Sequence, residues 1–244
     1  MRQQLAGVRR PFFSFYGSKF RAARRYPLPL HDHIIEPFAG SAGYALRYAN
    51  RRVSLFEVDP IIAGLWAYLI KVKPREIRSL PLEFESIGDL KISQEAKWLI
   101  GFWLGAGNHR PRQKPSSLMK RRLAGKKYPG GGNGLGTFWG EATRESIASQ
   151  LKFIRHWEVR NQSYEWVPNY KATWFIDPPY NCLAGRHYSY HCLDYNLLAY
   201  WCESRDGQVI VCEADGATWL PFRHLARTHS VNGFSSEVIW TNDY

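Results

Sequence analysis

Two short motifs carry the residue types most suited to binding and chemistry. Residues 36–43 (EPFAGSAG) follow an apolar run and are small enough to let the backbone approach a ligand closely. Residues 177–180 (DPPY) follow the apolar run 173–176 (TWFI), and the two successive prolines fix the backbone there. Each motif also suits an ordinary turn, but their combination after two predicted buried strands favours a shared binding site.

The DPPY motif places hydrogen-bond acceptors beside an aromatic ring. The Asp177 carboxylate and the Pro178 carbonyl provide two acceptors for one planar amino group, and Tyr180 provides a stacking face. Such a site could hold the exocyclic amine of a base in a geometry ready for attack. Glu57 closes the next apolar run, 17 positions after Gly40, a spacing at which an acid accepts hydrogen bonds from a pair of ribose hydroxyls.

The apolar patterning around these motifs predicts alternating strands and helices. We expect strands at 33–38, 53–57, 158–167, 173–177 and 208–213, with a C-terminal antiparallel hairpin of 227–233 and 237–241. We expect helices at 42–49, 61–72, 95–104, 144–157 and 194–203. This order predicts an α/β fold with a doubly wound, mostly parallel sheet, whose ligands lie beyond the carboxyl ends of the strands. Both motifs would then lie at the same edge of the sheet.

The segment between the two halves of this pattern is irregular and too long for a structureless loop in a compact domain. We therefore predict a core formed by residues 1–74 and 157–244, interrupted by a mostly helical insert at 75–156.

The positive charge of the chain is concentrated in that insert. The formal net charge is +12 and the sequence pI is about 9.6, which favours a polyanionic partner such as nucleic acid. No acidic residue lies between Glu95 and Glu141. A solvated basic face is the alternative, but interleaved turn formers favour a phosphate-tracking loop. The residues expected to contact nucleic acid are Arg110, Arg112, Lys114, Lys120, Arg121, Arg122, Lys126 and Lys127.

Other features exclude several classes of protein. With 45% hydrophobic and 22% charged residues, the composition is that of a globular protein and not of a disordered one. The four cysteines are ten positions apart, and the eight histidines have no ligand spacing, so we expect no metal site. His187 and His191 are expected to be a loop feature. No apolar run is long enough to span a bilayer, and the N-terminus lacks a signal-like apolar region, so we expect a cytoplasmic protein without a membrane partner.

Four motifs together resemble one known family. They are FSFYGSK at 13–19 (F-x-F-Y-G-S-K), EPFAGSAG at 36–43, EVDP at 57–60 and DPPY at 177–180. With them the chain resembles the DNA adenine methylase (Dam) family of S-adenosylmethionine-dependent methyltransferases. Residues 161–164 and 237–242 are weaker matches, and the resemblance does not cover the insert. The motif order, with the cofactor motif first and DPPY last, is similar to the alpha arrangement of that family.

The resemblance implies a Rossmann-like doubly wound methyltransferase sheet with an inserted target-recognition domain. It implies a DNA (adenine) methyltransferase that uses S-adenosyl-L-methionine and flips its target base out of double-stranded DNA. The catalytic residues would be Asp177, Pro178, Pro179 and Tyr180. The cofactor-binding residues would be Phe15, Tyr16, Gly17, Lys19, Glu36, Pro37, Phe38, Gly40, Gly43, Glu57 and Asp177. Glu57 is a departure, because the family usually has Asp at this position.

Three alternatives stay open from the sequence. The DPPY chemistry also suits the exocyclic amine of cytosine, and the basic insert also suits RNA. A catalytically silent DNA-binding protein is the alternative from another class. The motifs identify neither the recognition sequence nor the oligomeric state.

Overall fold

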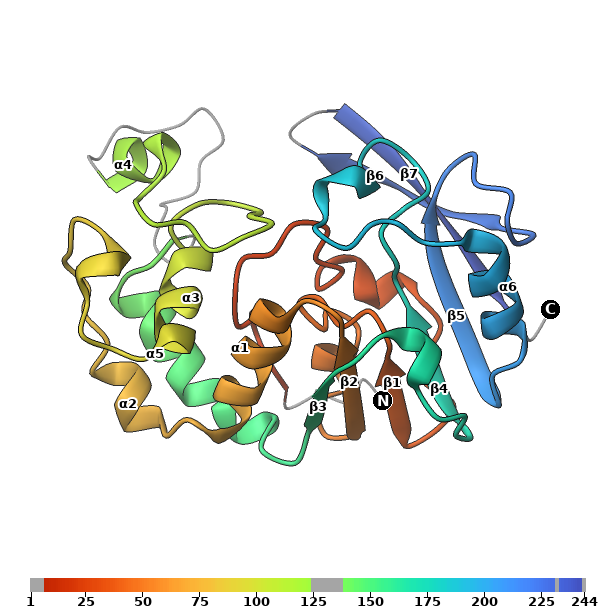
Figure 1. Ribbon diagram of the computed structural model, residues 1–244, viewed down its shortest axis with the longest axis horizontal. Coiled ribbons are helices and arrows are strands. Elements are labelled where there is room, and N and C mark those ends of the chain that lie inside the picture. The colour runs from red at the N-terminus through yellow and green to blue at the C-terminus, as the bar shows by residue number, and fades with distance from the viewer. Residues whose placement is uncertain (1–6, 124–137, 231–232, 243–244) are drawn as a thin grey trace, which may run out of the picture.

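The computed structural model describes the backbone of residues 7–123, 138–230 and 233–242, and the side chains of these except 121–123, 226–230 and 233–235. Its centre is a seven-stranded sheet with the strand order β3-β2-β1-β4-β5-β7-β6 (Figure 1). The strands are β1 His33–Glu36, β2 Arg52–Glu57, β3 Glu158–Asn161, β4 Ala172–Ile176, β5 Gly207–Ala214, β6 Arg223–Ser230 and β7 Gly233–Thr241.

The sheet is parallel from β3 to β5, and only the C-terminal hairpin is antiparallel. Strand β7 enters between β5 and β6 and pairs antiparallel with both. The order along the chain reverses between the neighbours β1 and β4, which are parallel. This is the topological switch point at which an open α/β sheet binds its ligands. The predicted Rossmann-like α/β fold is therefore confirmed, including the closing hairpin.

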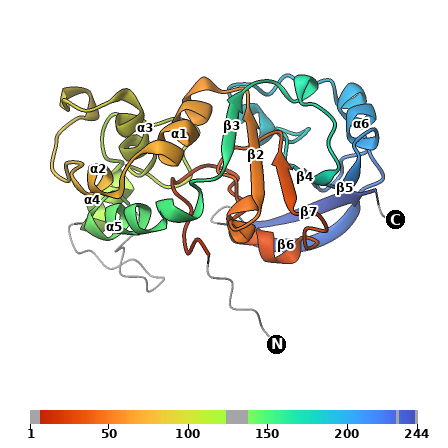
Figure 2. The ribbon, with the colours of Figure 1, turned by 90° about the horizontal axis from the view of Figure 1, so that it is seen from below.

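Both faces of the sheet are buried, because consecutive strand residues point to opposite sides. Ile34 packs into one apolar cluster with helix α1 Pro60–Lys71, whereas its neighbour Ile35 packs into a second cluster with α6 Tyr195–Glu203. Figures 1 and 2 show these two helices on different sides of the sheet. The pattern of continuous apolar strands follows from this double burial.

The residues Asp59 and Pro60 determine where helix α1 begins. The Asp59 carboxylate accepts a hydrogen bond from the N–H of Ile61, and Pro60 occupies the first helical position, where no N–H is needed. The apolar stripe Ile62, Leu65, Trp66 and Leu69 is buried. The helix ends just before Lys73-Pro74, as the proline requires.

The insert contributes four further α-helices among the described residues. They are α2 Pro74–Arg78, α3 Gln94–Phe102, α4 Ser117–Leu123 and α5 Glu141–Gln150. Both views show them grouped at one end of the molecule, beside α1 and away from β5 to β7 (Figures 1 and 2). Their apolar side chains, such as Leu99 and Ile147, belong to the same buried cluster as Ile34 of the sheet. The domain boundaries at 74/75 and 156/157 stay a prediction.

Two expected elements are shorter than predicted, for local reasons. The α-helix expected at 42–49 is a turn followed by the short 3₁₀ helix η2 Ala45–Tyr48, because Gly40 and Ala42 both have positive φ angles (44° and 50°). The strand expected at 158–167 ends at Asn161, where its only partner β2 also ends. The short 3₁₀ helix η5 Tyr164–Trp166 takes up the remaining residues.

The other elements differ from their predicted limits by a few residues. The first strand ends at Glu36 and not at 38, and α5 gives way to the 3₁₀ helix η4 Leu151–Phe153. The remaining 3₁₀ helices are η1 Ala22–Arg25, η3 Ile87–Asp89 and η6 Gly185–His187. None of the helices in the described ranges has the length and apolar character needed to cross a membrane.

Candidate active site

A cleft opens at the carboxyl ends of β1, β2 and β4. The structure brings ten of the eleven predicted cofactor-binding residues to its walls, and Pro37 is the exception. Of the predicted catalytic residues, Asp177 and Pro179 line the cleft, whereas Pro178 and Tyr180 do not. The sequence motifs therefore converge on one concave site.

The loop after β1 is held in place from both sides. The Gly40 N–H donates to Glu57 Oε2 (2.9 Å), and the Trp66 indole N–H donates to the Gly40 carbonyl (2.8 Å). The second oxygen of Glu57 accepts from the Asp59 N–H (3.0 Å). Glu57 thus joins the ends of β1 and β2, while each of its oxygens retains a lone pair for a further hydrogen bond.

The N-terminal segment 15–19 forms the opposite wall. Gly17 has a φ of +69°, and a Cβ at this position would overlap the hydroxyl of Tyr188. A Cβ on Gly43 would lie 2.5 Å from the Phe20 backbone nitrogen. The close approach that the sequence predicted at Gly43 is therefore one between two backbones of the protein itself. It packs the segment directly on the β1 loop.

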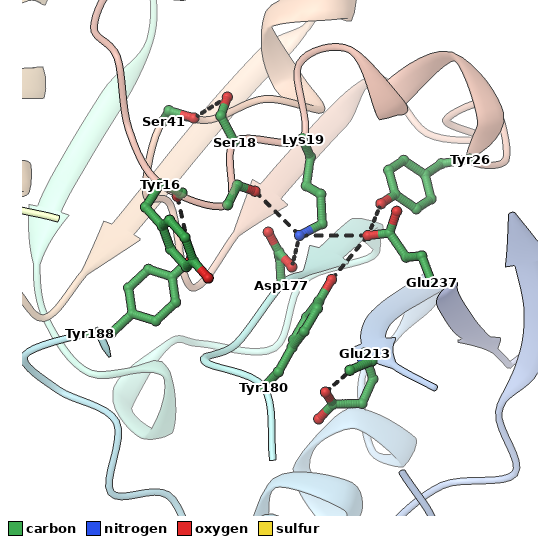
Figure 3. A network of polar contacts seen from close by, with 12 residues as sticks. Tyr16, Ser18, Lys19, Tyr26, Ser41, Asp177, Tyr180, Tyr188, Glu213 and Glu237 are labelled. Carbon is green, nitrogen blue, oxygen red and sulfur yellow. Dashed lines mark hydrogen bonds and ion pairs between the residues drawn. The ribbon is translucent and has the colours of Figure 1, made fainter. Parts of the chain in front are cut away.

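Lys19 joins this wall to the end of β4. Its ammonium lies 2.9 Å from Asp177 Oδ1 and 3.5 Å from Glu237 Oε1, and it donates to the Gly17 carbonyl (3.3 Å; Figure 3). Burial lowers the pKa of Lys19, but the two carboxylates outweigh it and raise that pKa above its ordinary value. Lys19 is therefore a fixed cation between two acids.

Tyr180 extends this cluster. Its hydroxyl donates to Glu237 Oε1 (2.9 Å), and the Lys19 ammonium lies 4.7 Å from the centre of its ring, within the range of a cation–π contact. A base that stacks on Tyr180 would use the face not covered by Lys19. The backbone of the motif is fixed as well, because the Tyr195 hydroxyl donates to the Pro179 carbonyl (2.6 Å).

Burial raises the pKa values of the acids in the cleft. Burial, partly offset by Lys19, raises the pKa of Asp177 to about 6. Burial raises the pKa of Glu57 to about 7 against the lowering effect of its backbone hydrogen bonds. Burial also raises the pKa of Glu36, which accepts from the Ala45 N–H (2.6 Å), well above the ordinary range. Strongly perturbed carboxyl groups in one cleft are typical of a functional site.

An aromatic cluster forms part of the cleft wall, to which Tyr16, His109 and Tyr188 contribute. The ring centres of Tyr16 and His109 are 4.2 Å apart, those of His109 and His187 are 5.2 Å apart, and the Tyr188 hydroxyl donates to the Tyr16 carbonyl (3.3 Å). Next to it, the Arg110 guanidinium donates to the hydroxyl of Ser189 (2.8 Å). The cluster thereby joins the insert to the loop that follows the DPPY motif.

Several residues that the fold brings to the site were not predicted from the sequence. Glu237 and Tyr26 belong to the Lys19 cluster, and Tyr188 and His109 line the cleft. Glu237 lies within a weak motif match, which is the one signal that could have indicated it. Tyr26, Tyr188 and His109 lie in segments without a recognised pattern, and only tertiary folding brings them together.

The predicted nucleic-acid contacts are described only in part. The side chains of Arg110, Arg112, Lys114 and Lys120 are exposed, and Lys120 lies on α4. Arg121 and Arg122 lie on the same helix, but their side chains are outside the described part of the chain, as are Lys126 and Lys127 altogether.

The described residues contain no group of three or more His, Cys, Asp or Glu side chains that could hold a metal ion. His187 is the last residue of the 3₁₀ helix η6, whereas His191 lies in the loop that follows it. His187 stacks on His109, and His191 Nδ1 lies 2.7 Å from the Tyr188 carbonyl.

Comparisons with known proteins show a weak structural similarity. No family model matches the chain, and no curated protein matches it. Among solved structures it is similar to the "putative methylase HI0767 from Haemophilus influenzae" (14% identity, TM-score 0.33, covering 86% of this chain and 78% of that one). It is also similar to the "putative methyltransferase yhhF from Escherichia coli" (10% identity, TM-score 0.32, covering 85% and 74%). Both scores are low, so the residues of the site itself carry the functional conclusion.

Proposed function

We propose that this protein is an S-adenosylmethionine-dependent methyltransferase that modifies the exocyclic amino group of adenine in double-stranded DNA. The observation that carries the proposal is the position of Asp177. Its carboxylate follows β4 and lies in the same cleft as the Gly40 loop and Glu57, on the two sides of the switch point. A nucleoside-binding half and an acceptor for an amine thus share one cavity.

The residues of the cleft fit this cofactor in chemical type. Glu57 retains lone pairs for ribose hydroxyls at the end of β2, and Phe15, Phe38 and Ile62 provide apolar surface for a base. Four acidic side chains line the cleft, against the one lysine among its walls (Glu36, Glu57, Asp59 and Asp177 against Lys19).

When bound, S-adenosylmethionine supplies a methyl group on a sulfonium centre, from which a neutral thioether leaves with the carbon–sulfur electron pair. The protein's part is to orient the nucleophile. Ionised Asp177 accepts a hydrogen bond from the target amine and thereby holds the amine nitrogen toward the cleft. The base that carries this amine stacks on the Tyr180 ring. Such positioning supplies a large share of the rate enhancement in comparable reactions. As the new carbon–nitrogen bond forms, positive charge develops on the amine nitrogen, and the Asp177 carboxylate would stabilise this charge and then accept the proton that the nitrogen releases.

A second hollow beside the motif gives room for the base. It is lined by Asn181, Tyr195 and Trp219, among others. The ring centres of Tyr195 and Trp219 are 5.5 Å apart, which places aromatic surface next to the DPPY segment. Aromatic surface of this kind suits a base that has left the duplex stack.

The test is transfer of a labelled methyl group from S-adenosylmethionine to unmethylated plasmid DNA, followed by sequencing that identifies the modified base. Methyladenine in a short fixed context supports the proposal. Detection of methylcytosine would mean that the substrate is cytosine and not adenine, and labelled RNA would mean that it is RNA and not DNA. Cofactor binding without transfer to any nucleic acid would contradict the proposal and favour the silent DNA-binding protein.

A further inference from the structure

Glu237 lies at the centre of the polar cluster behind Asp177, although it comes from β7, the last strand of the sheet. One of its oxygens, Oε1, accepts from the hydroxyls of Tyr26 (2.5 Å) and Tyr180 (2.9 Å) and lies 3.5 Å from the Lys19 ammonium (Figure 3). Its side chain is only 10% exposed. A carboxylate with three such neighbours in a buried position is firmly fixed.

We propose that Glu237 is a positioning residue of the active site, which acts through Lys19 and Tyr180 on the amine-binding carboxylate of Asp177. The proposal rests on the function proposed above and extends it to the C-terminal hairpin.

Glu237 determines the net charge of the cluster. One ammonium, that of Lys19, faces two carboxylates, those of Asp177 and Glu237. With both acids ionised the cluster retains one net negative charge. If Glu237 were absent, the Lys19–Asp177 pair would be neutral as a whole, and the amine would develop its positive charge beside a neutral pair. A fixed negative charge in a buried site stabilises that developing charge most effectively.

Glu237 also determines the geometry of the cluster. Lys19 has three N–H donors, and it contacts the Gly17 carbonyl, Asp177 and Glu237. Asp177 therefore forms an ion pair with Lys19 through Oδ1 and retains acceptor capacity for an amine. The bond from the Tyr180 hydroxyl to Glu237 fixes the rotation of the ring. Glu237 thus helps to orient both the Asp177 carboxylate and the Tyr180 ring. The hydrogen bond from the Tyr26 hydroxyl fixes Glu237 itself.

The groups that face Asp177 come from several elements. They are Lys19 from the N-terminal segment, Tyr26 directly after η1, Glu36 from β1, Tyr180 and Tyr188 from the loop after β4, Cys212 and Glu213 from β5, and Glu237 from β7. Among them, the charges of Glu237 and Glu213 raise the pKa of Asp177, and Lys19 lowers it. Removing the charge of Glu237 should therefore lower that pKa.

The test compares Glu237→Gln, Glu237→Asp and the wild type. Asp177 is titrated by carbon NMR of aspartate-labelled protein, with Asp177→Asn to assign its signal, and methyl transfer is measured over the same pH range. Glu237→Gln should lower the Asp177 midpoint by roughly one pH unit and lower kcat about tenfold, with KM for the cofactor nearly unchanged. Glu237→Asp keeps the charge and should stay near the wild-type midpoint.

Thr241→Val is the matched control on the same strand. The Thr241 hydroxyl is buried and has no hydrogen-bond partner among the described residues, and valine has nearly the same shape. This variant should change neither the Asp177 midpoint nor kcat. Circular dichroism checks that each variant folds, and if Glu237→Gln does not, Glu237→Ala, which removes the same charge, carries the test with the same expected fall of the Asp177 midpoint.

The proposal would be overturned if Glu237→Gln left the Asp177 midpoint unchanged. It would also be overturned if Thr241→Val or Glu237→Asp lowered that midpoint as much as Glu237→Gln does. The NMR result does not depend on turnover. A wild type that transfers no methyl group, together with a lowered midpoint in Glu237→Gln, would reject the proposed function but keep the coupling between the two acids.

Discussion

At the scale of single residues, burial gives the acids of the cleft their unusual properties. The ends of β1, β2 and β4 meet at one edge of the sheet, so Glu36, Glu57 and Asp177 share one cleft, in which Glu36 is buried and the other two are partly buried. Burial favours the neutral form of each acid, and hydrogen bonds or Lys19 restore part of the charged form. The balance between burial and these stabilising contacts differs from one acid to the next, so the three acids have different pKa values.

Methyl transfer should depend on the ionisation of Asp177. Its pKa is about 6, and the protonated form offers the amine a weaker acceptor, so kcat should fall as the pH decreases through about 6. Asp177→Ala should lower kcat by about 10²–10³-fold while DNA affinity stays close to that of the wild type. A pH–rate profile and a filter-binding assay check both statements. Loss of DNA affinity in step with activity would contradict this role.

Protein stability should depend on the ionisation of Glu57. Its pKa in the folded protein, about 7, lies above the ordinary value of 4.5, so the folded state holds the proton more tightly than the unfolded state. Its contribution to stability is fully present below about pH 4 and is lost as the pH rises through about 7. Urea unfolding should therefore show a smaller decrease in stability between pH 5 and 8 for Glu57→Gln than for the wild type. An equal decrease in both proteins would assign the effect to other groups.

At the scale of elements, the N-terminal segment and the β1 loop function as one unit because two backbones touch. Gly43 has no room for a side chain, since its Cβ would lie 2.5 Å and 2.8 Å from backbone atoms of Phe20 and Lys19. Any side chain there would push away the segment that carries Lys19.

Gly43→Ala should therefore destabilise the protein by roughly 1–3 kcal/mol and weaken cofactor binding as well. Gly140→Ala is the control, because Gly140 has extended backbone and no atom within 4 Å of the place that an added methyl group would take. Thermal unfolding and calorimetric titration with S-adenosylhomocysteine measure the two effects. Equal stability of the two variants would mean that the backbones at Gly43 move apart without cost.

Much of the element order could be predicted from the sequence, because the buried strands are apolar and each motif follows such a strand. The same pattern predicted that the DPPY strand and the GSAG loop share one edge of the sheet, and the structure brings them together. The turn before η2 was missed because Ala42 adopts a left-handed conformation that its residue type does not signal. The position of β7 between β5 and β6 determines where Glu237 lies, and local patterns contain no information about it.

At the scale of the whole molecule, basic and acidic side chains lie in different places. The exposed basic run lies on the insert, whereas the acids line the cleft at the sheet edge. The Arg110–Ser189 hydrogen bond joins the insert to the loop after DPPY. Binding of a polyanion to the insert would thus lie next to the site of chemistry.

Replacing Arg112, Lys114 and Lys120 with alanine should weaken DNA binding and lower the dependence of log Kd on log salt by about one for each phosphate that is no longer neutralised. Replacing Lys91, Lys152 and Lys171, which are also exposed, removes the same charge outside the run and should have a much smaller effect. Fluorescence anisotropy at several salt concentrations measures both. Equal slopes for the two triple variants would indicate that the basic run is only a solvated face.

The hydrogen bond between Tyr26 and Glu237 joins residues that are 211 positions apart, and this separation has a consequence for biosynthesis. The N-terminal segment leaves the ribosome long before β7 is made. Lys19 therefore lacks the Glu237 carboxylate, its second partner, until the end of β7 has been synthesised. We expect the last hairpin to dock late and slowly, since distant contacts carry the largest loop-closure cost. A nascent chain arrested before β7 would hold the four main motifs and still lack Glu237, so we expect the proposed methyl transfer to begin only after β7 has been made.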